Sequence, residues 1–146
     1  MNILPLHENF TMPTRGSDTA GGYDIYMPAD GELSHGLESR IELGFAASIP
    51  PGHVALLLPR SGAGATKGIS LRNTVGVIDQ DFRGQWIAVL KMDNFGVNRL
   101  TDKITWQAGD RLLQFVIVPV STPELVQVET LDETERGEGG FGSTGE

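Results

Sequence analysis

The sequence predicts an all-β domain, built as a sandwich or a barrel, from the way its apolar residues are divided. Its 146 residues include 19 glycines and 8 prolines, which separate short apolar stretches rich in Val, Ile, Leu and aromatic residues. Such punctuation is typical of strands joined by turns. The spacing of the stretches suits a sandwich or a barrel. A chain of this length forms a single domain of ordinary size.

Eight strands are predicted, each from a stretch of β-favouring residues bounded by turn residues. In chain order they are Tyr23–Tyr26, Ile41–Ile49, His53–Leu58, Val75–Ile78, Gln85–Met92, Ile104–Trp106, Arg111–Val118 and Leu125–Val128. One short helix is predicted over Gly62–Lys67, because this segment is too rich in Gly and Ala for a strand.

The end of the chain has a different character. After Leu131 the sequence becomes acidic and then rich in glycine, with Phe141 as its one aromatic residue. Such a segment cannot pack by itself. It is either a frayed terminus, as is usual for such tails, or an arm that acts at a site. Arg136 at its start and Phe141 within it favour the second interpretation.

The composition limits the partners. The formal net charge of −8 argues against nucleic acids and anionic membranes, because both require a basic surface. We therefore expect a small-molecule partner, although a local cluster of cations can still bind a polyanion. The absence of cysteine excludes disulfides and thiolate metal sites and is compatible with the cytoplasm. Residues 1–10 do not resemble an export signal, and Gln114 and Pro119 interrupt the longest apolar run.

Four arginines point to phosphate chemistry. Arg60, Arg83, Arg111 and Arg136 each lie in a short segment that contains glycine or aspartate. Glycine lets backbone N–H groups approach a phosphate, and the guanidinium group offers a planar fork to its oxygens. Each segment alone could be an ordinary turn or loop. The four together predict a phosphate-binding site.

Five segments also match, in order, the motifs of the homotrimeric dUTPase family, so the sequence resembles that family over most of its length. The matching segments are AGGYDI (Ala20–Ile25), PRSGAG (Pro59–Gly64), NTVGVIDQDFRG (Asn73–Gly84), GDRLLQ (Gly109–Gln114) and RGEGGFGSTG (Arg136–Gly145). The resemblance implies a distorted β-barrel of jelly-roll type. It also implies a division into a catalytic domain, residues 1–131, and a flexible C-terminal arm, residues 132–146.

The activity implied by the resemblance is hydrolysis of dUTP to dUMP and pyrophosphate. This reaction limits uracil incorporation into DNA and supplies dUMP for dTMP synthesis. Asp79 matches the carboxylate that orients and deprotonates the water attacking the α-phosphorus, and a general base must lie within hydrogen-bond reach of that water. The residues alone leave open a second role, an aspartate that only closes a turn.

The resemblance assigns roles to further residues. A β-hairpin matching Asn73–Val77 reads the uracil edge through its backbone, and Phe82 packs beneath the deoxyribose, where the family more often has tyrosine. Arg136 binds the γ-phosphate and Phe141 stacks over the uracil. The implied substrate-binding residues are Arg60, Ser61, Gly62, Asn73, Gly76, Val77, Ile78, Phe82, Gln114, Arg136, Phe141, Gly142 and Ser143, and the supporting residues are Asp24, Arg83, Asp110 and Arg111. For Arg83 and Arg111, structural ion pairing is the favoured role.

Magnesium and a homotrimer are also implied. No cluster of His or carboxylates has the spacing of an all-protein metal cage, but Mg²⁺ is bound mainly through substrate phosphates and waters. In the family each site is assembled from three subunits, and the third donates the arm.

The segment Met92–Trp106 is longer than usual, and we expect a surface loop there without an assigned function.

Four alternatives compete with this interpretation. A dCTP deaminase of the same fold is generally longer and has a different third motif. A regulatory trimer could bind dUTP without turning it over. A Ser61 nucleophile is disfavoured because His7, His35 and His53 lie in no hydrolase signature. A P-loop is disfavoured because Lys67 precedes Gly68 and no Gly-Lys-Ser or Gly-Lys-Thr follows.

Overall fold

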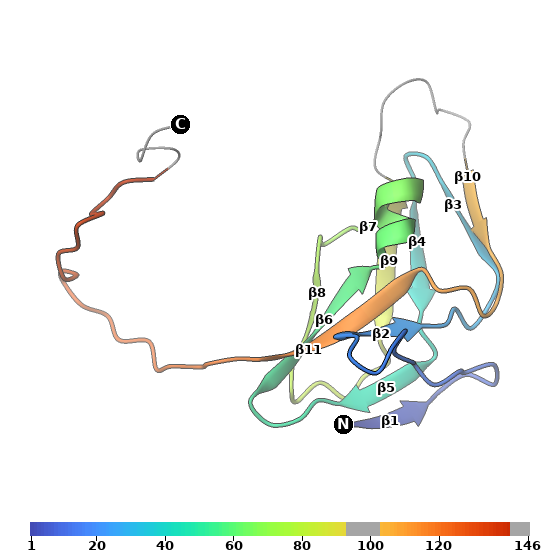
Figure 1. Ribbon diagram of the computed structural model, residues 1–146, viewed down its shortest axis with the longest axis horizontal. Helices are drawn as coiled ribbons and strands as arrows, with labels where there is room; N and C mark the ends of the chain where they lie inside the picture. The colour runs from blue at the N-terminus through green and yellow to red at the C-terminus, as the bar shows by residue number, and fades with distance from the viewer. Residues whose placement is uncertain (93–102, 141–146) are drawn as a thin grey trace.

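The computed structural model describes residues 1–92 and 103–140, and nearly all of its regular structure is β (Figure 1). The strands are β1 (Asn2–Pro5), β2 (Gly22–Ile25), β3 (Gly31–Ser34), β4 (Glu38–Glu42), β5 (Phe45–Ser48), β6 (His53–Pro59), β7 (Ile69–Leu71), β8 (Gly76–Ile78), β9 (Ile87–Met92), β10 (Lys103–Trp106) and β11 (Leu113–Pro119). A short π-helix, η1 (Gly62–Thr66), lies between β6 and β7. No helix within the described residues is long and apolar enough to cross a membrane.

The strands form antiparallel sheets of unequal size. The largest has the order β2–β11–β6–β8, the next has the order β4–β9–β7, and β1–β5 and β10–β3 form separate pairs. The predicted all-β fold of distorted jelly-roll type is confirmed. Among residues 1–92 and 103–140, hydrogen bonding does not close these sheets into one continuous barrel.

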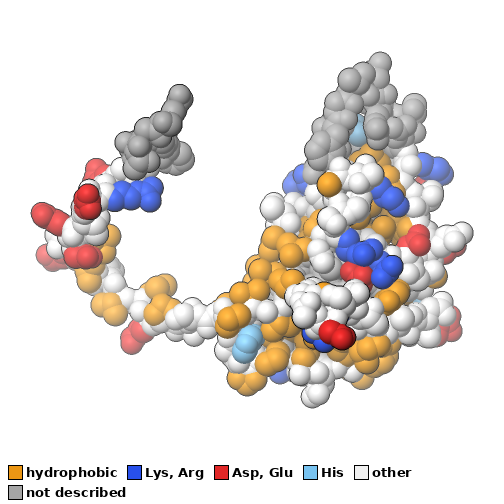
Figure 2. Space-filling view, in the orientation of Figure 1, with side chains coloured by type: hydrophobic (Ala, Val, Ile, Leu, Met, Phe, Trp, Pro, Cys, Tyr) orange, Lys and Arg blue, Asp and Glu red, His pale blue; other side chains and the backbone are white. Residues whose placement is uncertain are grey.

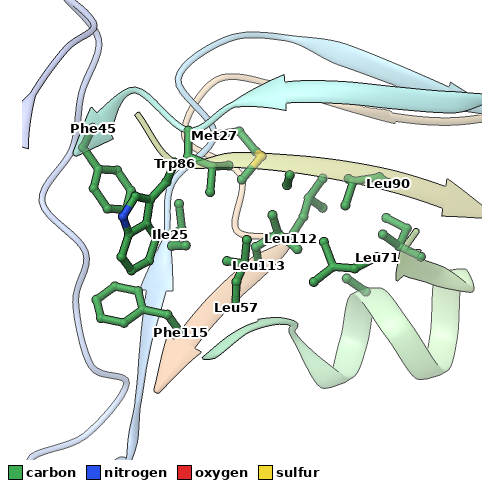
Figure 3. Close-up of a cluster of buried hydrophobic side chains, with 14 of the residues drawn as sticks. Ile25, Met27, Phe45, Leu57, Leu71, Trp86, Leu90, Leu112, Leu113 and Phe115 are labelled. Carbon is green, nitrogen blue, oxygen red and sulfur yellow. The ribbon is translucent and has the colours of Figure 1, made fainter. Parts of the chain in front are cut away.

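The two larger sheets face each other across a single apolar core (Figure 3). Alternate residues point inward, as the pleat requires, so that β9 buries Ala88 and Leu90. Trp86 is 0% exposed, and its ring lies 5.0 Å from Phe45 and 5.2 Å from Phe115. This packing makes the sheet that carries the site residues a rigid platform.

Most of the predicted elements are confirmed. The predicted strands at Tyr23–Tyr26, His53–Leu58, Val75–Ile78, Gln85–Met92, Ile104–Trp106 and Arg111–Val118 are found as β2, β6, β8, β9, β10 and β11, and the helix predicted at Gly62–Lys67 is found as η1. Three short strands, β1, β3 and β7, were not predicted. The turn-forming residues Pro5 and Gly31 obscure the first two, and β7 has only three residues, so its pairing with β9 decides its conformation.

The prediction of one strand over Ile41–Ile49 was wrong. The chain breaks at Gly44 into β4 and β5, which belong to different sheets. Gly44 has a φ of +78°, and a side-chain carbon there would lie 3.0 Å from His7 Cβ. Only glycine adopts such a backbone readily, so Gly44 turns the chain from one sheet to the other.

The prediction of a strand at Leu125–Val128 was also wrong. After β11 the chain leaves the sheets and extends away from them (Figure 1). Leu125, Val126 and Val128 are 92%, 73% and 56% exposed. Their composition favours a strand, but none of the described residues pairs with them, and a strand requires a hydrogen-bonded neighbour.

Candidate active site

A buried carboxylate gathers two of the predicted arginines. Asp24 on β2 is only 7% exposed, and its Oδ1 lies 2.7 Å from Arg60 Nε. Arg111 donates from a terminal guanidinium nitrogen to Oδ2 at 3.2 Å. Strand register brings the three together, because β2 and β6 flank β11 in the largest sheet. Two guanidinium groups are thereby held side by side. Figure 2 shows basic side chains gathered beside acidic ones in the middle of the face drawn.

The neighbouring polar side chains belong to the same cluster. Gln114 lies opposite Asp24 in the register and donates from Nε2 to the Pro59 carbonyl at 3.2 Å. A side-chain carbon on Gly22 would lie 2.8 Å from Gln114 Oε1, so this glycine leaves room for the amide. Ser61 is exposed at the start of η1, just before Gly62, and its hydroxyl makes no capping hydrogen bond. Arg60, Ser61, Gly62, Gln114 and Asp24 therefore lie together at one end of β6.

Sequence reasoning missed Tyr26, which belongs to this cluster. Its hydroxyl lies 2.7 Å from Thr14 Oγ1, and the Arg111 guanidinium lies over its ring, 5.8 Å from the centroid. Tyr26 therefore gives the Arg111 guanidinium a second contact beside Asp24. A signal was available, because Tyr26 follows Asp24 by two residues and alternate residues of a strand share a face.

We expect Asp24→Asn to lower the free energy of unfolding by about 1–2 kcal/mol, because it leaves two guanidinium groups without their anion. The loss stays below that of a fully buried pair, since the side chains of Arg60 and Arg111 are 35% and 43% exposed. Glu32→Gln is the matched control. Its partner Lys103 lies 3.0 Å away, both side chains are 58% exposed, and the expected change is below about 0.5 kcal/mol. Equal urea midpoints for the two variants would contradict this role of Asp24.

The segment Asn73–Val77 differs from the predicted hairpin. It connects β7 of one sheet to β8 of another, and the two strands do not pair, because β7 pairs with β9 and β8 with β6. Within the described residues, β8 is consequently an edge strand of the largest sheet. Its outer edge presents the backbone N–H and C=O groups of alternate residues of β8, which can bind a ligand.

The connection itself is tight and strained. The Val75 amide donates to the Asn73 carbonyl at 2.7 Å across Thr74, whose φ is +68°. This is a γ-turn of the rare strained class, and it is centred on a β-branched residue. A side-chain carbon on Gly76 would lie 2.9 Å from Leu57 Cβ, so glycine allows β8 to lie close against β6. Strained backbone of this kind clusters at ligand sites.

Asp79 begins a compact turn directly after β8. The Phe82 amide donates to the Asp79 carbonyl at 3.2 Å, and Gln80 Oε1 accepts from the Gly52 amide at 2.9 Å. Arg83 donates to the Gln80 and Phe82 carbonyls at 2.7 and 3.0 Å, which differs from the ion pair expected for it. The Asp79 side chain is exposed, and its carboxylate makes no hydrogen bond or ion pair with any described residue. It is therefore available to a water or a ligand.

The remaining predicted residues lie elsewhere. The Asp110 carboxylate accepts from the Gln107 amide at 2.9 Å, so it closes the turn before β11. Arg136 lies in the C-terminal arm and donates to the Gly139 carbonyl at 2.8 Å. Three predicted residues lie outside the described residues: Phe141, Gly142 and Ser143. Most of the long Met92–Trp106 segment, residues 93–102, also lies outside them. No group of three or more His, Asp or Glu that could hold a metal is found in 1–92 and 103–140.

Asp79 and the arginine cluster are far apart within one chain. Ile78 pairs with Ala55 near the start of β6, whereas Arg60 follows the last residue of β6. At about 3.3 Å per residue, the backbone positions of Asp79 and Arg60 are about 20 Å apart. This separation is well beyond hydrogen-bond reach, so one chain does not bring all the predicted residues to a single reacting phosphate.

A family model described as dUTPase matches residues 8–145. The chain belongs to the dUTPase family. It is 40% identical over 147 residues to a deoxyuridine 5'-triphosphate nucleotidohydrolase from Yarrowia lipolytica, covering 99% of this chain and 88% of the relative. The dUTPase of Staphylococcus bacteriophage 80alpha with dUPNHPP is similar in structure, with a TM-score of 0.87 and 32% identity over 99% of this chain and 97% of that chain.

A third relative concerns metal binding. A mutant dUTPase from phage phi11 of S. aureus, described with a structural Mg(II) ion, has a TM-score of 0.80. It is 30% identical over 90% of this chain and 98% of that chain.

Proposed function

We propose that this protein hydrolyses dUTP to dUMP and pyrophosphate, with Asp79 as the base that activates the attacking water. The observation that carries the proposal is the arginine pair held by Asp24 at one end of the largest sheet. The same sheet carries β8, which leads to Asp79, whose carboxylate has no partner among the described residues. Membership of the dUTPase family supports the same reaction. In a cytoplasmic setting, the reaction would limit uracil incorporation into DNA and supply dUMP for dTMP synthesis.

Asp79 acts by position rather than by strong basicity. A carboxylate is a weak base, so the position of Asp79 matters more than its basicity. It accelerates the reaction by holding one water in line with the α-phosphorus and accepting its proton as the bond to phosphorus forms. The bond to the pyrophosphate oxygen breaks in the same displacement, and its electron pair leaves with pyrophosphate. The exposure of the carboxylate supports this role, because water can reach it.

Base recognition is assigned to the free edge of β8. The backbone of Gly76, Val77 and Ile78, with the Asn73 side chain, hydrogen-bonds the uracil edge. The strained turn at Thr74 and the close contact of Gly76 with Leu57 support this role, because both hold the edge rigidly. Cytosine presents the reverse donor and acceptor order at position 4, so it would leave these groups unpaired. The expected preference for uracil over cytosine is up to about 10⁴-fold in kcat/KM.

The triphosphate is assigned to Arg60, Ser61, Gly62 and Gln114, with Arg136 from the arm on the γ-phosphate. Asp24 supports this group by holding Arg60 and Arg111. Arg83 instead supports the turn that follows Asp79, and Asp110 supports the turn before β11. Both Asp24 oxygens already face guanidinium groups, which fits a magnesium ion held mainly by triphosphate oxygens and waters rather than by a protein cage. Bound magnesium would offset the negative charge of the triphosphate during attack.

A homotrimer would complete the site. The separation of about 20 Å between Asp79 and Arg60 along β6 requires that one come from a neighbouring subunit if both act on one triphosphate. The exposed apolar residues after β11 support assembly, because Leu125, Val126 and Leu131 would be covered by a neighbour. Figure 2 shows hydrophobic side chains along this segment. We propose that residues 1–131 form the catalytic body and that the arm, 132–146, closes over the site of a neighbouring subunit, with Phe141, Gly142 and Ser143 against the substrate.

A pyrophosphate-release assay on dUTP, UTP, dCTP and dTTP, with and without magnesium, tests the proposal. We expect turnover of dUTP with magnesium and slower turnover of the other three by at least about 10²-fold. Phe82 leaves no room for a 2'-hydroxyl, cytosine leaves the backbone groups of β8 unpaired, and thymine is rejected by crowding of its methyl group. Ammonia release from dCTP would instead identify a deaminase. Binding of dUTP without turnover would favour a regulatory trimer.

A further inference from the structure

Gly84 and Phe82 are in contact within the turn that follows Asp79. A side-chain carbon built on Gly84 would lie 2.6 Å from Phe82 Cζ, 3.0 Å from Cε2 and 3.4 Å from Cε1. The far edge of the phenyl ring therefore rests on the position where any other residue would carry its side chain. The φ of Gly84 is outside the left-handed region, so its backbone conformation does not require glycine.

Little else fixes the ring. Phe82 is 43% exposed, and among the described residues it takes part in no aromatic pair and does not belong to the hydrophobic core. Its backbone, in contrast, is well held, because its amide donates to Asp79 and its carbonyl accepts from Arg83. The position of the ring above this fixed turn consequently depends on the absence of a side chain at residue 84.

We propose that Gly84 is a positioning residue for substrate selection. Because Gly84 has no side chain, the Phe82 ring can lie close against the turn. In that position the ring leaves room for a deoxyribose but none for a 2'-hydroxyl. This inference rests on the proposed role of Phe82 in dUTP hydrolysis. A methyl group at residue 84 lifts the ring by about 1 Å to reach ordinary carbon–carbon contact. The atoms that must move are the far end of one exposed side chain, so the turn itself stays in place.

The test is a double-mutant cycle on the full-length protein, with steady-state kinetics on dUTP and UTP. We expect Gly84→Ala to raise KM for dUTP by about tenfold, to change kcat by less than about threefold, and to alter the ratio of kcat/KM between dUTP and UTP. In a Phe82→Ala background the same substitution should have no effect beyond about twofold, because the ring that it displaces is gone.

Gly16→Ala is the matched control, since Gly16 has open space around it and an ordinary φ, and we expect it to keep wild-type kinetics and thermal stability. If Gly84→Ala alone unfolds but the double variant folds, the clash with the ring is confirmed. Wild-type kinetics for Gly84→Ala would overturn the inference, as would an effect that persists in the Phe82→Ala background. The proposed function fails separately, if the wild type leaves dUTP intact or if Phe82→Ala keeps the wild-type selectivity between dUTP and UTP.

Discussion

Replacing Asp79 with Asn is expected to lower kcat for dUTP by about 10²- to 10⁴-fold, the range that a positioned general base contributes, while dUTP still binds. The amide keeps the size of the side chain but cannot accept the proton of the attacking water. Because the Asp79 side chain makes no hydrogen bond or ion pair with the described residues, the substitution should leave the fold unchanged. Pyrophosphate release, calorimetric titration with a non-hydrolysable analogue and thermal unfolding measure the three properties.

Asp18→Asn is the control for this variant, because Asp18 is an exposed aspartate outside the proposed site. It removes the same charge and should keep wild-type turnover. If Asp79→Asn retained more than a few per cent of the wild-type rate, Asp79 would not be the base. Loss of binding together with turnover would indicate a role in holding the substrate.

The same variant also tests whether the site spans subunits. Asp79→Asn and Arg60→Ala should each be inactive alone, yet regain activity when subunits of the two are mixed after denaturation and refolding together. Some mixed trimers then contain an intact Asp79 and an intact Arg60 from different chains at one site. A site built within one chain would stay inactive in every mixture, and this outcome would exclude the composite site inferred from the separation of about 20 Å along β6.

Deleting residues 136–146 is expected to lower kcat/KM for dUTP by about 10²- to 10³-fold, because it removes one charge-assisted phosphate contact and the lid that excludes water. Residues 132–140 of the arm are separate from the sheets in a single chain, so the body should still fold and assemble (Figure 1). Kinetics and sedimentation equilibrium together measure both effects.

Point variants separate the contributions to this effect. Arg136→Lys keeps the charge but loses the planar fork, and Phe141→Ala removes only the ring expected over the uracil. Both should retain part of the activity lost on deletion. Unchanged kinetics after the deletion would reduce the segment to a terminus without a catalytic role.

The strands could be predicted where composition and pairing agree. His53–Leu58 and Gln85–Met92 are rich in Val, Ile and Leu, and in the structure each is a strand with a partner on both sides. The prediction failed where composition did not decide the outcome. Leu125–Val128 has the residues of a strand without a partner, and Gly44 interrupts an apolar run that reads as continuous. Pairing is a non-local property, so local propensity alone does not determine it.

By itself, the sequence determined the kinds of residue available: a carboxylate at Asp79, arginines in glycine-containing turns, and an acidic chain without cysteine. Only the tertiary structure decided their arrangement. It placed Asp24 between Arg60 and Arg111, made β8 an edge strand among the described residues, and put Asp79 at the far end of β6 from Arg60. The physical reason is that strand register and burial bring together residues far apart in the chain, and no local pattern encodes these distances.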